Sequence, residues 1–211
     1  MSSVDRFKRG AFFSKEFVAG TTTGTTNWNG FEHNLLFERV GDKEFADVAR
    51  PTGCDAIEDS RGVAIADLNG DGLLDIVVNN NNAAPAIYLN RVADAGNWVQ
   101  MKLLAGPGCN RDAIGTRVQV RTNQGGQSRT LTRWVEAGSG YAAQSDMRVH
   151  FGIGDAEGIE SVSVRWPDGS AQTFAGGALP QEMNSRWQIE QGSASIAQPR
   201  ATDVAGRFQG E

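Results

Sequence analysis

Apolar and polar residues alternate in short runs along most of this chain, and Gly, Asn and Asp separate the runs. The runs at 34–40 and 44–49 flank a Gly-Asp-Lys turn and predict a β-hairpin. Those at 61–68, 73–80 and 86–91 predict three further strands of ordinary length. We expect these strands to form a first module.

A second set of alternating runs follows, in which valines and Trp98, Trp134 and Trp166 alternate with polar residues, as a half-buried sheet requires. The predicted strands are 97–106, 115–123, 127–137, 147–154, 160–167, 171–176 and 185–191. Gly-rich turns join them, and this arrangement predicts a β-sandwich or flattened barrel. The fold class is therefore all-β, with a small β-module joined to a sandwich.

The same patterns predict four regions. Residues 1–30 are rich in Thr, Gly and Asn and predict a flexible arm, and residues 31–95 contain the first module. Residues 96–191 form the predicted sandwich. The segment 192–211 has few large apolar residues, so we expect a disordered tail.

Charge and hydropathy narrow the classes of partner. The formal net charge is −5 and basic residues are scattered, so we expect neither nucleic acid nor an anionic membrane surface as a partner. The sequence contains neither an apolar run of the ~20 residues that a membrane helix needs nor a signal peptide, so we expect no membrane insertion. Localisation stays open on these grounds.

The segment 67–75, Asp-Leu-Asn-Gly-Asp-Gly-Leu-Leu-Asp, carries the clearest chemistry. Oxygen-bearing side chains alternate along it, and hard Ca²⁺ prefers six to eight oxygen ligands. The predicted calcium ligands are the side chains of Asp67, Asn69, Asp71 and Asp75 and the backbone carbonyl of Leu73. Mg²⁺ suits the loop less well, because it keeps several waters and seldom uses a dedicated protein loop.

The flanks of this loop distinguish it from an EF-hand. An EF-hand requires Glu at position 12, which is Val78 here, and both flanks alternate as strands rather than helices. An acidic turn without metal is the alternative, but three carboxylates within nine residues would then repel one another. We expect a structural ion whose binding stabilises the fold.

The stretch RGVAIADLNGDGLLDIVVNNNNAAPAIYLNR resembles the FG-GAP, or VCBS, repeat of β-propellers. The resemblance implies calcium binding through a D-x-[DN]-x-D-G-x-x-D loop, which Asp67, Asn69, Asp71, Gly72 and Asp75 match. Such proteins usually carry enough repeats to close a propeller, whereas this chain has one complete repeat and part of another. A partial blade leaves sheet edges open, so we expect either the sandwich or a second copy of the chain to cover them.

The stretches NWVQMKLLAG, NRDAIGTRVQV, EAGSGYAAQSDMRVHFGIG and VRWPDGSAQTF resemble, in order, an ASPIC/UnbV domain of CRTAC-type proteins. The two resemblances cover about residues 34–190. They favour an extracytoplasmic or secreted protein. We expect a calcium-stabilised adhesion or scaffold protein that contacts protein or glycan; the alternative is an auxiliary protein or enzyme of secondary-metabolite biosynthesis.

Catalytic signals are sparse, so we expect a non-catalytic protein and predict no catalytic residue. Only His33 and His150 offer imidazole bases, without a nucleophile motif or phosphate loop. Three residue groups leave alternatives open: a second cation site or a solvated loop, turn capping or ligand binding, and a disulfide or free thiols. These groups are respectively Asp55, Glu58 and Asp59; Asn110, Arg111, Asp112, Tyr141, Gln144, Ser145 and Asp146; and Cys54 with Cys109.

Overall fold

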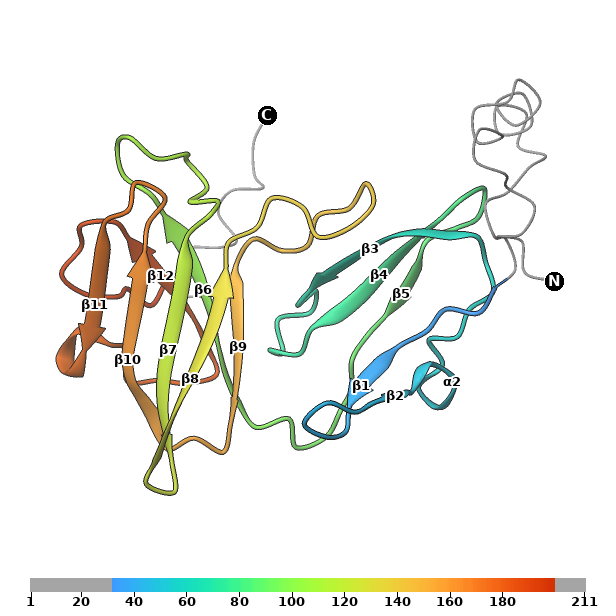
Figure 1. Cartoon of the computed structure of the whole chain (residues 1–211), viewed down its shortest axis with the longest axis horizontal. Coiled ribbons are helices and arrows are strands. Elements are labelled where there is room, and N and C mark those ends of the chain that lie inside the picture. Colours follow the sequence, from blue (N-terminus) through green and yellow to red (C-terminus); the bar gives the residue numbers. More distant parts are fainter. Residues whose placement is uncertain (1–31, 200–211) are drawn as a thin grey trace. The chain divides into compact units, whose positions relative to one another are not determined.

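The structure is a computed structural model that describes residues 32–199, and its chain divides into two compact units (Figure 1). Of the described residues, the first unit comprises 32–64, 76–88 and 140–143, and the second comprises 65–75, 89–139 and 144–199. The predicted N-terminal arm, 1–30, lies outside the described residues. No helix within 32–199 is both long and apolar enough to cross a membrane.

The first unit opens with the predicted hairpin, which is confirmed. Strands β1 (Phe37–Arg39) and β2 (Phe45–Asp47) pair antiparallel, and the Arg39 guanidinium donates to the carbonyls of Gly41 and Asp42 in the turn. The one-turn helix α2 (Ala49–Thr52) follows and ends where Gly53 adopts a positive φ of 74°.

The next three predicted strands form one sheet in the order β3-β4-β5, with β4 and β5 antiparallel. Their bounds are β3 Ser60–Ala66, β4 Asp75–Asn80 and β5 Ala86–Tyr88. Several large apolar side chains of the first unit stay exposed, including Phe37, Phe45 and Ile87, which are 58%, 62% and 59% exposed. The partial blade therefore leaves much of its apolar surface in solvent.

The second unit contains two sheets. In the first, the order is β12-β6-β9, with β6 antiparallel to β9 and parallel to β12. In the second, the order is β11-β10-β7-β8, and all neighbours are antiparallel. The strands are β6 Asn97–Leu104, β7 Arg117–Gln124, β8 Gln127–Trp134, β9 Val149–Gly154, β10 Gly158–Arg165, β11 Ala171–Ala175 and β12 Ser185–Glu190, and the short 3-10 helix η3 spans Gly176–Ala178.

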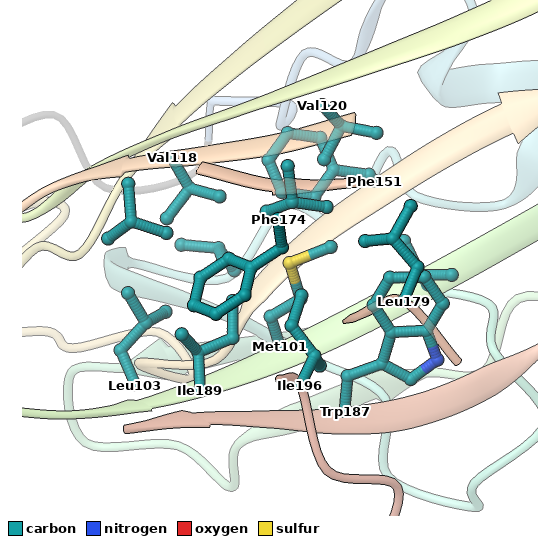
Figure 2. Packing of buried hydrophobic residues seen from close by; sticks show 14 of the residues in the cluster. Met101, Leu103, Val118, Val120, Phe151, Phe174, Leu179, Trp187, Ile189 and Ile196 are labelled. Atoms are coloured by element: carbon teal, nitrogen blue, oxygen red, sulfur yellow. The ribbon is translucent and has the colours of Figure 1, made fainter. Parts of the chain in front are cut away.

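The core of the second unit lies between these two sheets (Figure 2). Because successive residues of a strand point to opposite faces, Val99, Met101 and Leu103 of β6 enter the core while the residues between them face away. Trp187 and Ile189 of β12 and Val118, Val120, Phe151, Val162, Val164 and Phe174 of the other strands complete it. The predicted sandwich is therefore confirmed, and the protein is mostly β.

The segment after β12 differs in part from the disordered tail predicted for 192–211. Ile196 is buried in the sandwich core, and its backbone N–H donates to the Ala178 carbonyl at 2.9 Å. Ala197 exchanges backbone hydrogen bonds with Gln188 of β12. One large apolar side chain thus anchors residues 192–199, whereas 200–211 lie outside the described residues.

Candidate metal-binding loop

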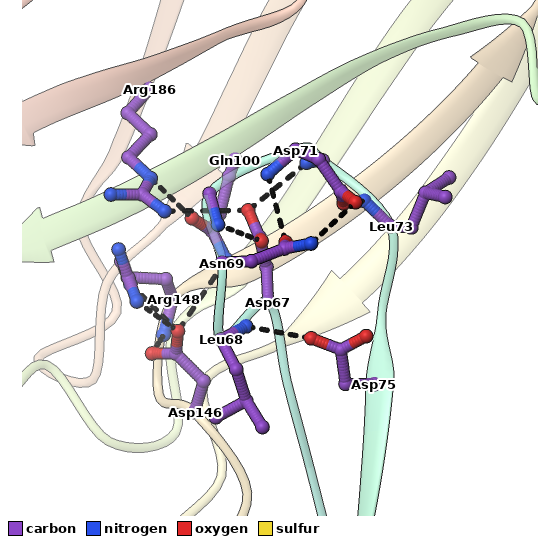
Figure 3. A network of polar contacts seen from close by, with 12 residues as sticks. Asp67, Leu68, Asn69, Asp71, Leu73, Asp75, Gln100, Asp146, Arg148 and Arg186 are labelled. Carbon is purple, nitrogen blue, oxygen red and sulfur yellow. Dashed lines mark hydrogen bonds and ion pairs between the residues drawn. The ribbon is translucent and has the colours of Figure 1, made fainter. Parts of the chain in front are cut away.

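The loop 67–75 joins β3 to β4, as its sequence predicts, and belongs to the second compact unit. Its curl depends on two glycines, since Gly70 and Gly72 have φ values of 81° and 87°, which other residues rarely adopt. Figure 3 shows the side chains of Asp67, Asn69 and Asp71 gathered along the inside of this curl.

The oxygens of these three side chains accept hydrogen bonds from the loop itself. The Asp67 carboxylate accepts from the backbone N–H groups of Gly70 and Gly72, at 2.7 and 3.2 Å. Asp71 accepts from the Leu73 backbone N–H at 2.8 Å and from the Asn69 amide at 2.7 Å. Each loop position thus restrains a neighbour, and the oxygens are already oriented.

Asp75 closes the loop in a different environment. It is fully buried, and its two oxygens accept from the backbone N–H groups of Leu68 and Asn90, each at 2.9 Å. Among the described residues it has no ion-pair partner. A buried carboxylate without a compensating positive charge is costly, so this position favours a nearby cation.

The donor set fits Ca²⁺ by its chemistry: three carboxylates and one amide oxygen, two of the carboxylates buried, on a loop with glycines where curvature is needed. The arrangement is not that of a gathered metal centre, because no group of three or more His, Cys, Asp or Glu side chains within 32–199 is positioned to hold an ion. Ion binding would therefore exchange hydrogen bonds such as that from Asn69 to Asp71 for contacts with the ion. The five predicted ligands stay a prediction.

The loop lies against the outer face of the β12-β6-β9 sheet. Arg186, Gln100 and His150 form one row across that face, since Gln100 is the register partner of both others. Arg186 donates to the Asp67 carboxylate at 3.3 Å and to the Gln100 side-chain oxygen at 3.1 Å (Figure 3). Gln100 has no solvent-exposed surface, because the loop covers it.

Asp146 extends this polar network on the other side of Gln100. Its carboxylate accepts from the Gln100 amide at 3.4 Å and from the Arg148 Nε at 2.7 Å (Figure 3). Its backbone N–H donates to the Ile65 carbonyl, while the Ile65 N–H donates to the Ser145 hydroxyl. Ser145 and Asp146, two of the polar residues selected from the sequence, therefore bind the end of β3 just before the loop.

An aromatic contact completes the contacts of the loop. Gly72 lies directly against the indole of Trp98, which stacks on His150 with ring centroids 5.9 Å apart. Burial lowers the pKa of His150, and the nearby Asp67 carboxylate opposes that shift only in part. The His150 Nδ1 is buried without a hydrogen-bond partner, so the neutral ring suits this position.

The other candidates fall at separate places. Asp59 pairs with Arg61, and Asp55 lies 3.7 Å from His33 in the acidic loop that also contains Glu58. Asn110 caps its turn through both backbone groups of Ile114, Arg111 pairs with Asp112 at the surface, and Tyr141 is 75% exposed. Cys54 and Cys109 are free thiols.

Three residues of the loop environment escaped sequence reasoning: Trp98, Gln100 and Arg186. Each occupies a polar-face position of an alternating strand, and such a position is typical of a solvent-facing side chain. The only available signal was their gathering on one strand row, which requires the pairing of β12 with β6 to be known.

Comparison with known proteins identifies both halves of the chain. Residues 16–78 match the model of the FG-GAP-like repeat, and residues 106–196 match that of ASPIC and UnbV. Cartilage acidic protein 1 of Xenopus tropicalis is 29% identical over 185 residues, which cover 84% of this chain and 27% of that protein. The human protein of the same name is 31% identical over 143 residues, which cover 64% of this chain and 20% of that protein.

The chain therefore carries an FG-GAP-like repeat followed by an ASPIC/UnbV domain and is distantly similar to cartilage acidic protein 1. It spans between a fifth and about a quarter of the length of these curated relatives, at 20% and 27%. The resemblance read from the sequence is confirmed.

Proposed function

We propose that this chain is a calcium-stabilised β-rich module of an adhesion or scaffold protein that works through contacts with protein or carbohydrate. The observation that carries the calcium part is Asp75, a buried carboxylate with two N–H donors and no ion pair within the described residues, at the end of a loop with alternating oxygen donors. A bound Ca²⁺ supplies the positive charge that this arrangement needs.

The loop geometry gives the ion a structural role. Its ligands would come from a segment whose Asp67 already contacts Arg186 on β12, so an ion that orders the loop also orders its contact with the sheet face. A ligand that binds only the folded state stabilises it by about 2.7 kcal/mol at a concentration 100 times its dissociation constant. The binding energy of calcium thereby becomes folding stability.

Thermal unfolding tests this proposal. The wild-type chain, Asp71→Ala and the surface control Asp112→Ala are melted with calcium, with magnesium and with chelator. We expect calcium to raise the melting temperature of the wild type and of the control by several degrees, magnesium to act more weakly, and the Asp71 variant not to respond. Equal melting of the wild type in all three solutions would overturn the calcium role.

The contact role draws support from the exposed apolar side chains of the first unit. Phe37 and Phe45 on the hairpin and Ile87 on β5 are more than half exposed, and large exposed apolar surfaces are typical of interaction sites. We propose a second copy of the chain as one partner. Light scattering is expected to show a defined dimer, which Phe37→Ser with Phe45→Ser would weaken; a wild-type monomer at all concentrations would contradict self-association.

The alternative role in secondary-metabolite biosynthesis rests on the resemblance alone. No observation within residues 32–199 favours a particular reaction.

A further inference from the structure

The outer face of the four-stranded sheet carries two arginines and a tryptophan side by side. Arg117 of β7 is the register partner of Arg165 on β10 and of Trp134 on β8, so the three residues form one row across adjacent strands. Side chains in directly opposite positions lie within contact range, and like charges placed there repel one another. The row therefore concentrates positive charge beside an aromatic ring.

This row borders a surface hollow of about 310 Å³. Its remaining walls come from Gly115 before β7 and from Trp166, Pro167 and Gly169 after β10. Trp166 is buried and belongs to the core, whereas Trp134 is 52% exposed. The hollow thus has a fixed floor and one freely accessible aromatic side chain.

The two arginines have no acidic partner within residues 32–199. The Nε of Arg117 is buried and lacks a hydrogen-bond acceptor. Asp168 in the adjoining turn is engaged elsewhere, because its carboxylate accepts from Ser170 and Gln191, and the Ser170 bonds lower its pKa. The donors that face this hollow are therefore available to a bound acceptor.

We propose that this hollow binds an acidic sugar, with the carboxylate or sulfate group held by Arg117 and Arg165 and the sugar ring placed against Trp134. A guanidinium presents paired N–H donors that match the oxygens of such groups, and an anion between the two cations offsets their repulsion. An exposed indole offers a flat apolar surface with a polar edge, which suits a ring that has both apolar and hydroxyl faces. The small open hollow accommodates a sugar unit rather than a long peptide strand.

The net charge of −5 shapes the expected affinity. Long-range attraction of a polyanion is weak for such a chain, so local contacts must provide the binding, and its salt dependence should reflect about two charges. This inference names a ligand class for the proposed contact role. Because the hollow is separate from the loop 67–75, failure of calcium binding and failure of sugar binding are distinguishable.

Isothermal titration and chemical-shift mapping of the whole chain test the proposal. The probes are a uronic-acid disaccharide, a sulfated disaccharide, a neutral disaccharide and a glutamate-rich peptide. We expect one or both acidic sugars to bind, with no detectable binding of the neutral sugar. The carboxylate and sulfate arms identify which group the arginines hold.

Three variants locate the site. Arg117→Gln and Arg165→Gln should each weaken binding at least tenfold, and Trp134→Ala should weaken it severalfold, while each keeps the wild-type melting temperature within a few degrees. Arg129→Gln removes an exposed charge from the same strand as Trp134 and should bind as the wild type does. The proposal is overturned if neither acidic sugar binds, if the peptide binds more tightly than both, or if folded Arg117 and Arg165 variants bind normally.

Discussion

Gly72 and Trp98 are in such close contact that a Cβ on Gly72 would lie 2.0 Å from the Nε1 and Cε2 atoms of the indole. Gly72 also has a φ of 87°. The glycine therefore serves two purposes, since it permits the turn of the loop and allows the loop backbone to lie flat on the sheet face.

Gly72→Ala should destabilise the protein by more than the strain of a positive φ alone. The clash with Trp98 adds to a backbone cost of about 1–2 kcal/mol. Gly169→Ala is the matched control, because Gly169 has the same φ of 87° and no atom within 4 Å of an added Cβ. Urea unfolding measures both variants, and equal losses would show that the contact with Trp98 relaxes at little cost.

Arg186→Gln should have opposite effects in chelator and in calcium. Without calcium, Asp67 loses its positive partner, and because Arg186 is about a third exposed we expect a loss of about 1–2 kcal/mol. With calcium, removal of a neighbouring positive charge reduces repulsion of the ion, so the calcium-induced rise in melting temperature should exceed that of the wild type. A smaller rise would indicate that Arg186 supports the ion-bound loop.

His150 should make the fold sensitive to mild acid. Its pKa in the folded protein lies below the ordinary value of 6.5, so the unfolded chain takes up the proton more readily. The contribution of the neutral ring is complete above pH 6.5 and is lost as the pH falls through the lowered pKa. In chelator, the decline in melting temperature between about pH 7 and 5 should be smaller for His150→Gln than for the wild type.

Ile189→Ala should cost about 2–5 kcal/mol, because this side chain is fully buried between the sheets and its truncation leaves a cavity. Ile87→Ala makes the same chemical change at a side chain that is 59% exposed, and should cost less than about 1 kcal/mol. Denaturant unfolding of the two variants checks the contrast. Similar losses would mean that Ile87 is covered in solution, for example by a second copy of the chain.

Local patterns predicted much of this structure. Alternation identified the strands because one face of each is buried, as in Val99, Met101 and Leu103 of β6. The spacing of Asp67, Asn69, Asp71 and Asp75 placed the loop between two strands, as observed. These features depend on residues close together in the chain.

Pairing between distant strands could not be predicted in the same way. Alternation shows which face of a strand is apolar but not which strand lies beside it, so the parallel pairing of β12 with β6 was missed. Gln100 illustrates the consequence: its polar side chain predicts exposure, yet the loop covers it completely. The surroundings of the loop depend on tertiary contacts that no short motif encodes.

The bond from Arg186 to Asp67 spans 119 positions of sequence, which has a consequence for synthesis on the ribosome. Translation proceeds from the N-terminus, so the loop leaves the exit tunnel long before the strand that carries its arginine. During that interval Asp67 lacks this partner, and the face of β6 that the loop covers lacks its outer neighbour. Calcium bound early would hold the nascent loop in shape until the last strand arrives.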